Sequence, residues 1–162
     1  MLDRRQMILA LAALPLLVSK PSRALAAKPV LRVSGGASGA SVTYDAAGLD
    51  ALPQTRFVTA TPWNAKPIEF RGVSARDLFQ AAGVQGEHLQ LIALNDYVVE
   101  AKTSDILAGD GLFATHQDGV PMPLSAKGPV FLMFPFDLRP ELKHQSYYSR
   151  SVWQLAEVVV TP

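Results

Sequence analysis

The side chains best suited to catalysis or metal binding are scarce in this chain of 162 residues. Cysteine is absent, which excludes disulfides, thiol nucleophiles, zinc–thiolate sites, iron–sulfur ligation and lipoprotein attachment. The three histidines are His88, His116 and His144, and no two of them have the i,i+4 spacing that places two ligands on one helix face. We therefore expect no metal site built from histidine.

Hydrolysis by a serine, a histidine and an acid would need a trio brought together by the fold. His116, Asp118 and Ser125 are the closest such group in the sequence, but His116 ends an expected strand at a turn, which favours an exposed histidine. Asp137 and Glu141 lie in one polar loop, where solvated charges are the usual finding. The chain also contains no nucleophile elbow, phosphate loop, dinucleotide fingerprint or EF-hand loop. The residues alone give no argument for catalysis.

Composition and charge indicate a folded globular protein. Hydrophobic residues make up 49% of the chain and charged residues 18%, which is unlike a disordered or fibrous chain. The formal net charge of +1 provides no basic field for nucleic acid, so we expect no nucleic-acid partner.

The first 26 residues have the organisation of a signal peptide that is removed by cleavage. Arg4 and Arg5 precede an apolar run at Met7–Val18, and small residues lead to a cleavage site after Ala26 or Ala27. Twelve apolar residues are too few to span a hydrocarbon core of ~30 Å. The two arginines are typical either of a twin-arginine signal or of an ordinary Sec signal, and both export routes stay open.

The expected mature protein is a single domain, residues 27–162, in a bacterial periplasm. Removing residues 1–26 takes away four basic residues and one acidic residue, which changes the formal net charge from +1 to −2. We expect no membrane insertion of the mature chain after cleavage.

Short alternating apolar segments predict a mainly β domain with two or three short helices, which defines an α+β class. The clearest helix is Ala75–Ala82, with Ser74 and Asp77 as a capping box and Gly83 at its end. Asn95-Asp96 predicts a two-residue hairpin turn. A continuous apolar run at Val130–Phe134 suits a central strand, and Tyr147–Thr161 is expected to form the last strand.

Four segments together resemble the oxidoreductase molybdopterin-binding domain, which has the sulfite-oxidase-type fold. In chain order they are Phe70–Phe79 (FRGVSARDLF), Ala93–Tyr97 (ALNDY), Gly128–Pro135 (GPVFLMFP) and Tyr147–Leu155 (YYSRSVWQL). The resemblance covers about residues 55–160. It implies a mixed, barrel-like β-sheet structure with short inserted helices.

The sequence departs from the enzymes of that family at the residue that binds molybdenum. The enzymes place a cysteine at the end of the strand before the first segment, whereas this chain has Phe57–Asn64 (FVTATPWN) there. A cysteine-free subgroup is similar in its Thr-x-Thr-Pro-Trp stretch, and its members are periplasmic pterin-binding proteins that work beside membrane signalling proteins. The resemblance therefore implies a pterin ligand and no molybdenum.

A pterin site needs an aromatic face and a few amide-type or hydroxyl groups. Trp63 follows a strand in a proline-flanked loop and is expected to form a wall of the site, whereas Trp153 alternates with Leu155 and is expected in the core. Asn95 and Asp96 fit a hairpin turn and a binding role equally well. The predicted ligand-binding residues are Thr59, Thr61, Trp63, Asn95, Asp96, Tyr97, Tyr148 and Arg150.

Alternatives remain for several of these residues. Thr59 or Thr61 would also serve to cap a turn. Tyr97 and Tyr148 would also fit half-buried strand positions, and Arg150 would also fit an ion pair with Glu141 or another acid.

The leading hypothesis is a non-enzymatic periplasmic protein that reports a pterin to the periplasmic domain of a membrane signalling protein, either a cyclic-di-GMP enzyme or a sensor kinase. The alternatives are a molybdopterin-dependent oxidoreductase with an unusual metal ligand and its cofactor-free accessory subunit.

Overall fold

The computed structural model describes residues 28–162, so the predicted signal peptide, residues 1–26, lies outside the described residues. The strands are β1 (Pro29–Gly35), β2 (Ala40–Asp45), β3 (Gln54–Thr61), β4 (Asn64–Ser74), β5 (His88–Ala93), β6 (Val98–Lys102), β7 (Leu112–Gln117), β8 (Val120–Pro121), β9 (Phe131–Met133) and β10 (Leu155–Thr161). The helices are α1 (Ala46–Asp50), α2 (Ala75–Ala82), α3 (Thr103–Ala108) and α4 (Gln145–Arg150), with short 3-10 turns η1 (Leu124–Ala126) and η2 (Pro140–Leu142).

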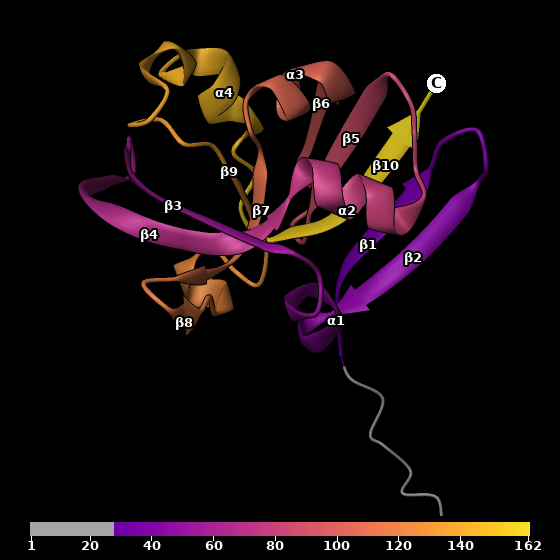
Figure 1. Cartoon of the computed structure of the whole chain (residues 1–162), viewed down its shortest axis with the longest axis horizontal. Coiled ribbons are helices and arrows are strands. Elements are labelled where there is room, and N and C mark those ends of the chain that lie inside the picture. Colours follow the sequence, from indigo (N-terminus) through magenta and orange to yellow (C-terminus); the bar gives the residue numbers. More distant parts are fainter. Residues whose placement is uncertain (1–27) are drawn as a thin grey trace, which may run out of the picture.

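The strands form two open sheets (Figure 1). The first has the order β2-β1-β10-β5-β6, and its β1–β10 pair is parallel while its other pairs are antiparallel. The second has the order β3-β4-β7-β8, with β9 also paired to β7, and is antiparallel throughout. The predicted α+β class and mixed sheet are confirmed. The barrel-like part of that prediction is wrong, since no closed barrel forms among residues 28–162.

The best-defined sequence signals form as predicted. Helix α2 has the predicted bounds, and the Ser74 hydroxyl accepts from the Asp77 backbone N–H (3.1 Å) while donating to the Asp77 carboxylate (2.6 Å). Gly83 ends the helix in the left-handed conformation, at φ +66°.

The predicted strand at Tyr147–Thr161 is wrong in its first half, because residues 145–150 form helix α4. An extended chain would send neighbouring side chains to opposite faces. Here the Tyr147 ring packs on Phe134 and the Tyr148 ring packs on Phe136, each with ring centroids 5.1 Å apart. The His144 ring nitrogen accepts from the Ser146 backbone N–H (3.3 Å) and caps the helix. Tertiary packing and this cap override the β propensity of the tyrosines.

Two glycines of the family-like segments lie where backbones come close together. A Cβ on Gly72 of β4 would overlap the Phe113 carbonyl of β7, and a Cβ on Gly128 would overlap the Met122 carbonyl. Both positions therefore require a residue without a side chain, which explains why glycine occupies them.

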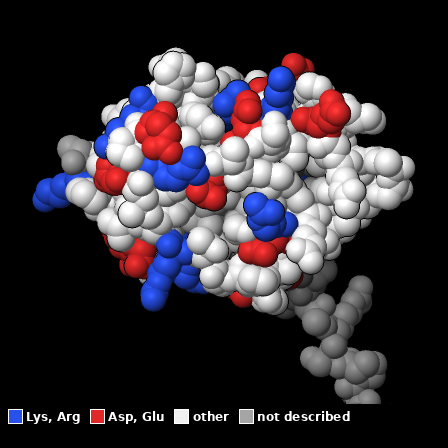
Figure 2. All heavy atoms as spheres, turned by 45° about the horizontal axis from the view of Figure 1, so that its top comes forward, with Lys and Arg blue, Asp and Glu red and all other residues white. Residues whose placement is uncertain are grey.

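The described surface carries mixed charge. On the face shown in Figure 2, basic and acidic side chains alternate, and broad areas between them carry neither. Among residues 28–162 no helix is both long enough and apolar enough to cross a membrane.

Candidate functional site

The hairpin between β3 and β4 holds Trp63 at its tip. The Thr61 hydroxyl oxygen accepts from the backbone N–H groups of Trp63 (3.2 Å) and Asn64 (3.1 Å). Thr61 is therefore the residue that caps this turn, one of the two roles open to it from the sequence. The turn sets the direction in which the Trp63 side chain leaves the sheet.

The Trp63 ring lies among three other aromatic rings, and we call these four residues the aromatic wall. Its centroid is 6.0 Å from that of Trp153, 6.1 Å from that of Phe131 and 6.3 Å from that of Tyr148. Phe131 is buried in β9, whereas Trp63 and Trp153 remain 37% and 39% exposed. Two large rings are thus fixed by their neighbours and still face solvent.

The expectation that Trp153 belongs to the core is wrong. Gln154 has φ +50°, which interrupts the extended chain, and β10 begins only at Leu155. The alternation that joined Trp153 to Leu155 in the sequence therefore stops between them.

A hollow of about 360 Å³ adjoins Trp153 and is lined by Leu124, Ser125, Lys127, Trp153 and Gln154. The Lys127 ammonium nitrogen lies 5.3 Å from the centroid of the Trp153 ring, within the range of a cation–π contact. Lys127 and Trp153 were missed as site residues. Trp153 lies inside the segment Tyr147–Leu155, and Lys127 directly precedes the segment Gly128–Pro135. These positions could have indicated a site, but the strand periodicity around Trp153 favoured a core residue instead.

Thr59 and Asp137 join strand β3 to the segment that follows β9. The Asp137 carboxylate accepts from the Ala60 backbone N–H (2.6 Å) and pairs with the Lys143 ammonium (2.8 Å), while the Asp137 backbone N–H donates to the Thr59 hydroxyl (3.1 Å). We call this arrangement the Asp137 clasp. Thr59 is 0% exposed, so it has no surface from which to contact a ligand. Asp137 is exposed in its loop, as expected for a solvated charge, and it also anchors the loop to β3, which the sequence did not predict.

The hydrogen bond from Lys143 and the bond from the Ala60 N–H hold the pKa of Asp137 below its ordinary value. The ionised form is therefore the one that the folded protein stabilises.

The predicted hairpin with a turn at Asn95 and Asp96 is confirmed, but its loop is longer than the two residues predicted, since β5 ends at Ala93 and β6 begins at Val98. The Asn95 side-chain oxygen accepts from the Tyr97 N–H (3.3 Å), and Asp96 has φ +63°. The turn lies beside the aromatic wall, because the Leu94 N–H donates to the carbonyl of Gln154, the residue after Trp153 (2.9 Å). Tyr97 is 50% exposed and makes none of the ring contacts of the wall.

Tyr148 and Arg150 belong to the same short helix but have different surroundings. Tyr148 is part of the aromatic wall. Arg150 pairs with Asp105 of α3 (2.8 Å) and lies over the Tyr147 ring at 5.4 Å. The structure therefore brings Trp63 and Tyr148 together and engages Arg150 in joining α4 to α3.

The serine–histidine–acid trio is not assembled. His116 is buried rather than exposed, because β7 is an inner strand of its sheet. Its Nδ1 lies 2.8 Å from the Thr115 hydroxyl oxygen, and burial together with nearby Arg71 lowers its pKa against the opposing effect of Asp50. Asp118 accepts from the Glu69 N–H (3.0 Å). No hydrogen bond joins His116 to Ser125 within the described part of the chain.

The residues at the end of β3 do not fit a protein-bound molybdenum. Ala60 has no ligating atom, and the Thr61 oxygen already accepts two backbone N–H groups. A threonine hydroxyl is also a poor replacement for a soft thiolate. Residues 28–162 contain no cluster of three or more histidine, aspartate or glutamate side chains placed to hold a metal ion.

No known family model matches this chain, and no curated protein sequence matches it. Among solved structures, its fold is similar to that of a chain in the crystal structure of the sulfane dehydrogenase SoxCD from Paracoccus pantotrophus, with a TM-score of 0.61 and 14% sequence identity. The match covers 81% of this chain and 37% of the SoxCD chain. This likeness concerns the fold alone, and it is consistent with the sulfite-oxidase-type fold that the four sequence segments predict.

Replacing Asp137 with asparagine is expected to lower the free energy of unfolding by up to about 1 kcal/mol at pH 7, since the partly exposed ion pair with Lys143 is lost and solvent already screens it. The pKa of Asp137 is lower in the folded protein than in the unfolded chain. The ionised carboxylate therefore stabilises the fold at pH values above its ordinary pKa, and this stabilisation is lost as the pH falls through the lowered pKa. The difference between wild type and variant should therefore shrink below about pH 4. Urea unfolding at several pH values measures it.

The matched control is Asp96→Asn, at a turn residue that forms no ion pair among the described residues and whose left-handed backbone asparagine tolerates. It should change stability by less than about 0.5 kcal/mol. A difference between wild type and Asp137→Asn that does not vary with pH would contradict the clasp.

Proposed function

We propose that the protein binds a pterin without catalysing a reaction, at the aromatic wall and the adjoining hollow. The observation that carries this proposal is the solvent exposure of two ordered tryptophan rings. Trp63 and Trp153 are 37% and 39% exposed, although aromatic contacts fix both rings. A rigid aromatic surface loses little conformational freedom when a flat heterocycle stacks on it.

The hollow beside Trp153 adds polar groups at the edge of this surface. Ser125 provides a hydroxyl, and Gln154 provides its side-chain oxygen, while its amide nitrogen already donates to the Leu124 carbonyl (2.9 Å). Lys127 provides a cation next to the Trp153 ring. A pterin alternates donors and acceptors along its ring edge, so it matches an aromatic face bordered by a few such groups better than a purely apolar ligand does.

The proposal extends to export and signalling. The signal-peptide pattern of residues 1–26 supports a periplasmic location. The resemblance to the cysteine-free subgroup of pterin-binding proteins supports a partner that is the periplasmic domain of a membrane signalling protein, either a cyclic-di-GMP enzyme or a sensor kinase. Exposed apolar side chains next to the wall supply a contact surface, namely Leu94 (54%), Tyr97 (50%) and Val98 (48%). The Leu94–Gln154 hydrogen bond joins this surface to the segment that carries Trp153.

A molybdopterin-dependent oxidoreductase, or its accessory subunit, is the second candidate. The fold likeness to a chain of a dehydrogenase favours it, and the lack of a thiolate ligand weighs against the catalytic form. Elemental analysis of the purified protein tests the catalytic form, since about one molybdenum per chain would favour the oxidoreductase. Identification of the bound small molecule tests the accessory subunit, which would release no pterin.

Trp63→Ala is expected to weaken the binding of pterin, or of its tetrahydro form, by about 1–3 kcal/mol, the range for loss of one aromatic stacking partner. Isothermal titration calorimetry measures the change, and circular dichroism checks that the fold is retained. Leu138→Ala is the control, because this side chain is 70% exposed and does not line the hollow. Unchanged affinity in Trp63→Ala would refute the assignment of the site.

Pterin binding is expected to change the affinity for the receptor domain. The reason is that the aromatic wall and the exposed apolar surface at Leu94 meet at Trp153 and Gln154. By thermodynamic linkage, the receptor domain must then change pterin affinity by the same factor. Titration of the protein with the receptor domain, with and without pterin, measures both quantities. Equal receptor affinities in the two conditions would leave a pterin-binding protein that does not report its ligand.

A further inference from the structure

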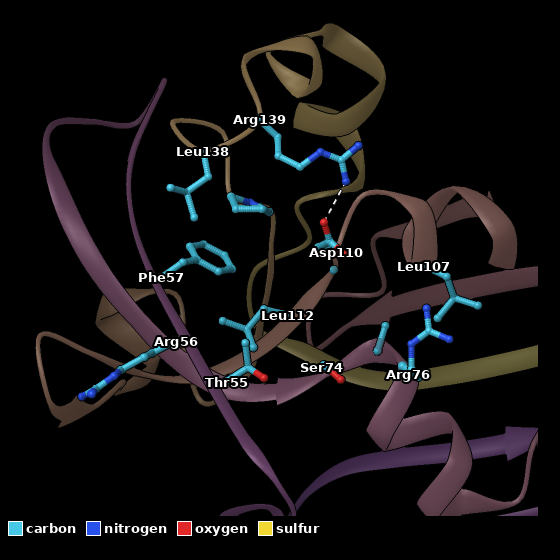
Figure 3. Close-up of a pocket in the computed structure, with 13 residues that line it drawn as sticks. Thr55, Arg56, Phe57, Ser74, Arg76, Leu107, Asp110, Leu112, Leu138 and Arg139 are labelled. Carbon is cyan, nitrogen blue, oxygen red and sulfur yellow. Dashed lines mark hydrogen bonds and ion pairs between the residues drawn. The ribbon is translucent and has the colours of Figure 1, made fainter.

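A second cavity lies beside the edge strand β3 and is separate from the hollow beside Trp153 (Figure 3). Its volume is about 370 Å³, which falls within the range of small-molecule sites. The walls are β3, the start of α2, the connection from α3 to β7, and residues 135–139. It shares no lining residue with the hollow. We call it the β3 cleft.

The interior of the β3 cleft is apolar. Phe57 and Leu112 form buried parts of its lining, with 9% and 1% of their surfaces exposed. Leu138 lies above them in Figure 3 and is 70% exposed, so it forms an apolar rim that is open to solvent. An apolar body of a few carbon atoms would remove much of the exposed Leu138 side chain and the small exposed part of Phe57 from water, above a floor that includes the buried Leu112.

The charged side chains of the β3 cleft differ in the ion pairs and hydrogen bonds that they already form. Arg139 bonds to Asp110 (2.7 Å), to Glu141 (2.8 Å) and to the Ala108 carbonyl (2.6 Å). Arg56 points away from the cleft in Figure 3, whereas Arg76 extends toward Leu107 on its wall. Within residues 28–162, Arg76 is exposed and forms no ion pair. It therefore places an uncompensated cation beside an apolar cavity.

From this arrangement we infer that the β3 cleft binds a small carboxylate with an apolar body. The body packs against Leu138 and the exposed edge of Phe57, and the carboxylate accepts hydrogen bonds from the Arg76 guanidinium, whose planar donors match two carboxylate oxygens. The inference does not depend on the proposed pterin site, because the two cavities have different linings.

The test uses 3-phenylpropionate as the probe and follows the amide resonances of the whole isotopically labelled protein during titration. We expect saturable shifts at Phe57, Arg76, Leu112 and Leu138. Arg76→Gln should weaken binding by about tenfold, the effect of losing a charged hydrogen-bonding partner. The neutral amide of the same acid should bind the wild-type protein about tenfold more weakly for the same reason.

Arg56→Gln is the matched control, since Arg56 belongs to the lining but its side chain points away from the cleft in Figure 3, so the variant removes the same charge without removing a donor from the cleft. It should leave the affinity for 3-phenylpropionate unchanged, and so should Trp63→Ala, which separates this site from the proposed pterin site. Absence of saturable shifts at millimolar probe, equal affinity for acid and amide, or equal losses in Arg76→Gln and Arg56→Gln would overturn the inference.

Discussion

The Asp137 clasp is the constraint on which the arrangement of the site depends. Strand β3 is an edge strand, so only β4 holds it through the sheet. The carboxylate of Asp137 adds a second support by accepting the Ala60 N–H, and the Asp137 N–H completes the link by donating to Thr59. The same segment leads to α4, which carries Tyr148. The clasp thus holds the Trp63 hairpin and the Tyr148 helix next to each other.

A continuous series of aromatic contacts crosses the second sheet and joins the two cavities. The ring of Phe57, at the β3 cleft, lies 6.4 Å from that of Phe70, which lies 6.0 Å from that of Phe131. The Trp63 ring lies 6.1 Å from that of Phe131 and 6.0 Å from that of Trp153, which lines the hollow. Close-packed interiors have low compressibility. The series therefore gives both cavities rigid walls.

Local sequence signals were sufficient for much of the fold and for part of the site. The capping box of α2, the position of the Asn95-Asp96 turn and the loop position of Trp63 depend on residues close in the chain, and each lies where it was predicted. The error at Trp153 is local as well, since the left-handed backbone of Gln154 interrupts the strand. The other failures concern contacts between distant residues. Helix α4 forms because Tyr147 and Tyr148 pack on the Phe134–Phe136 segment. Arg150 pairs with Asp105 of α3, and Asp137 accepts from the backbone of Ala60, which is 77 residues away in the chain. Sequence periodicity does not contain such information.

A pterin site at the aromatic wall is tested by mass spectrometry of the small molecules released from protein purified from its native compartment. We expect one pterin per folded chain, lost from a Trp63→Ala variant that keeps its fold. Release of no heterocycle, or release of a pterin in equal amount from wild type and from Trp63→Ala, would contradict a pterin site at the aromatic wall.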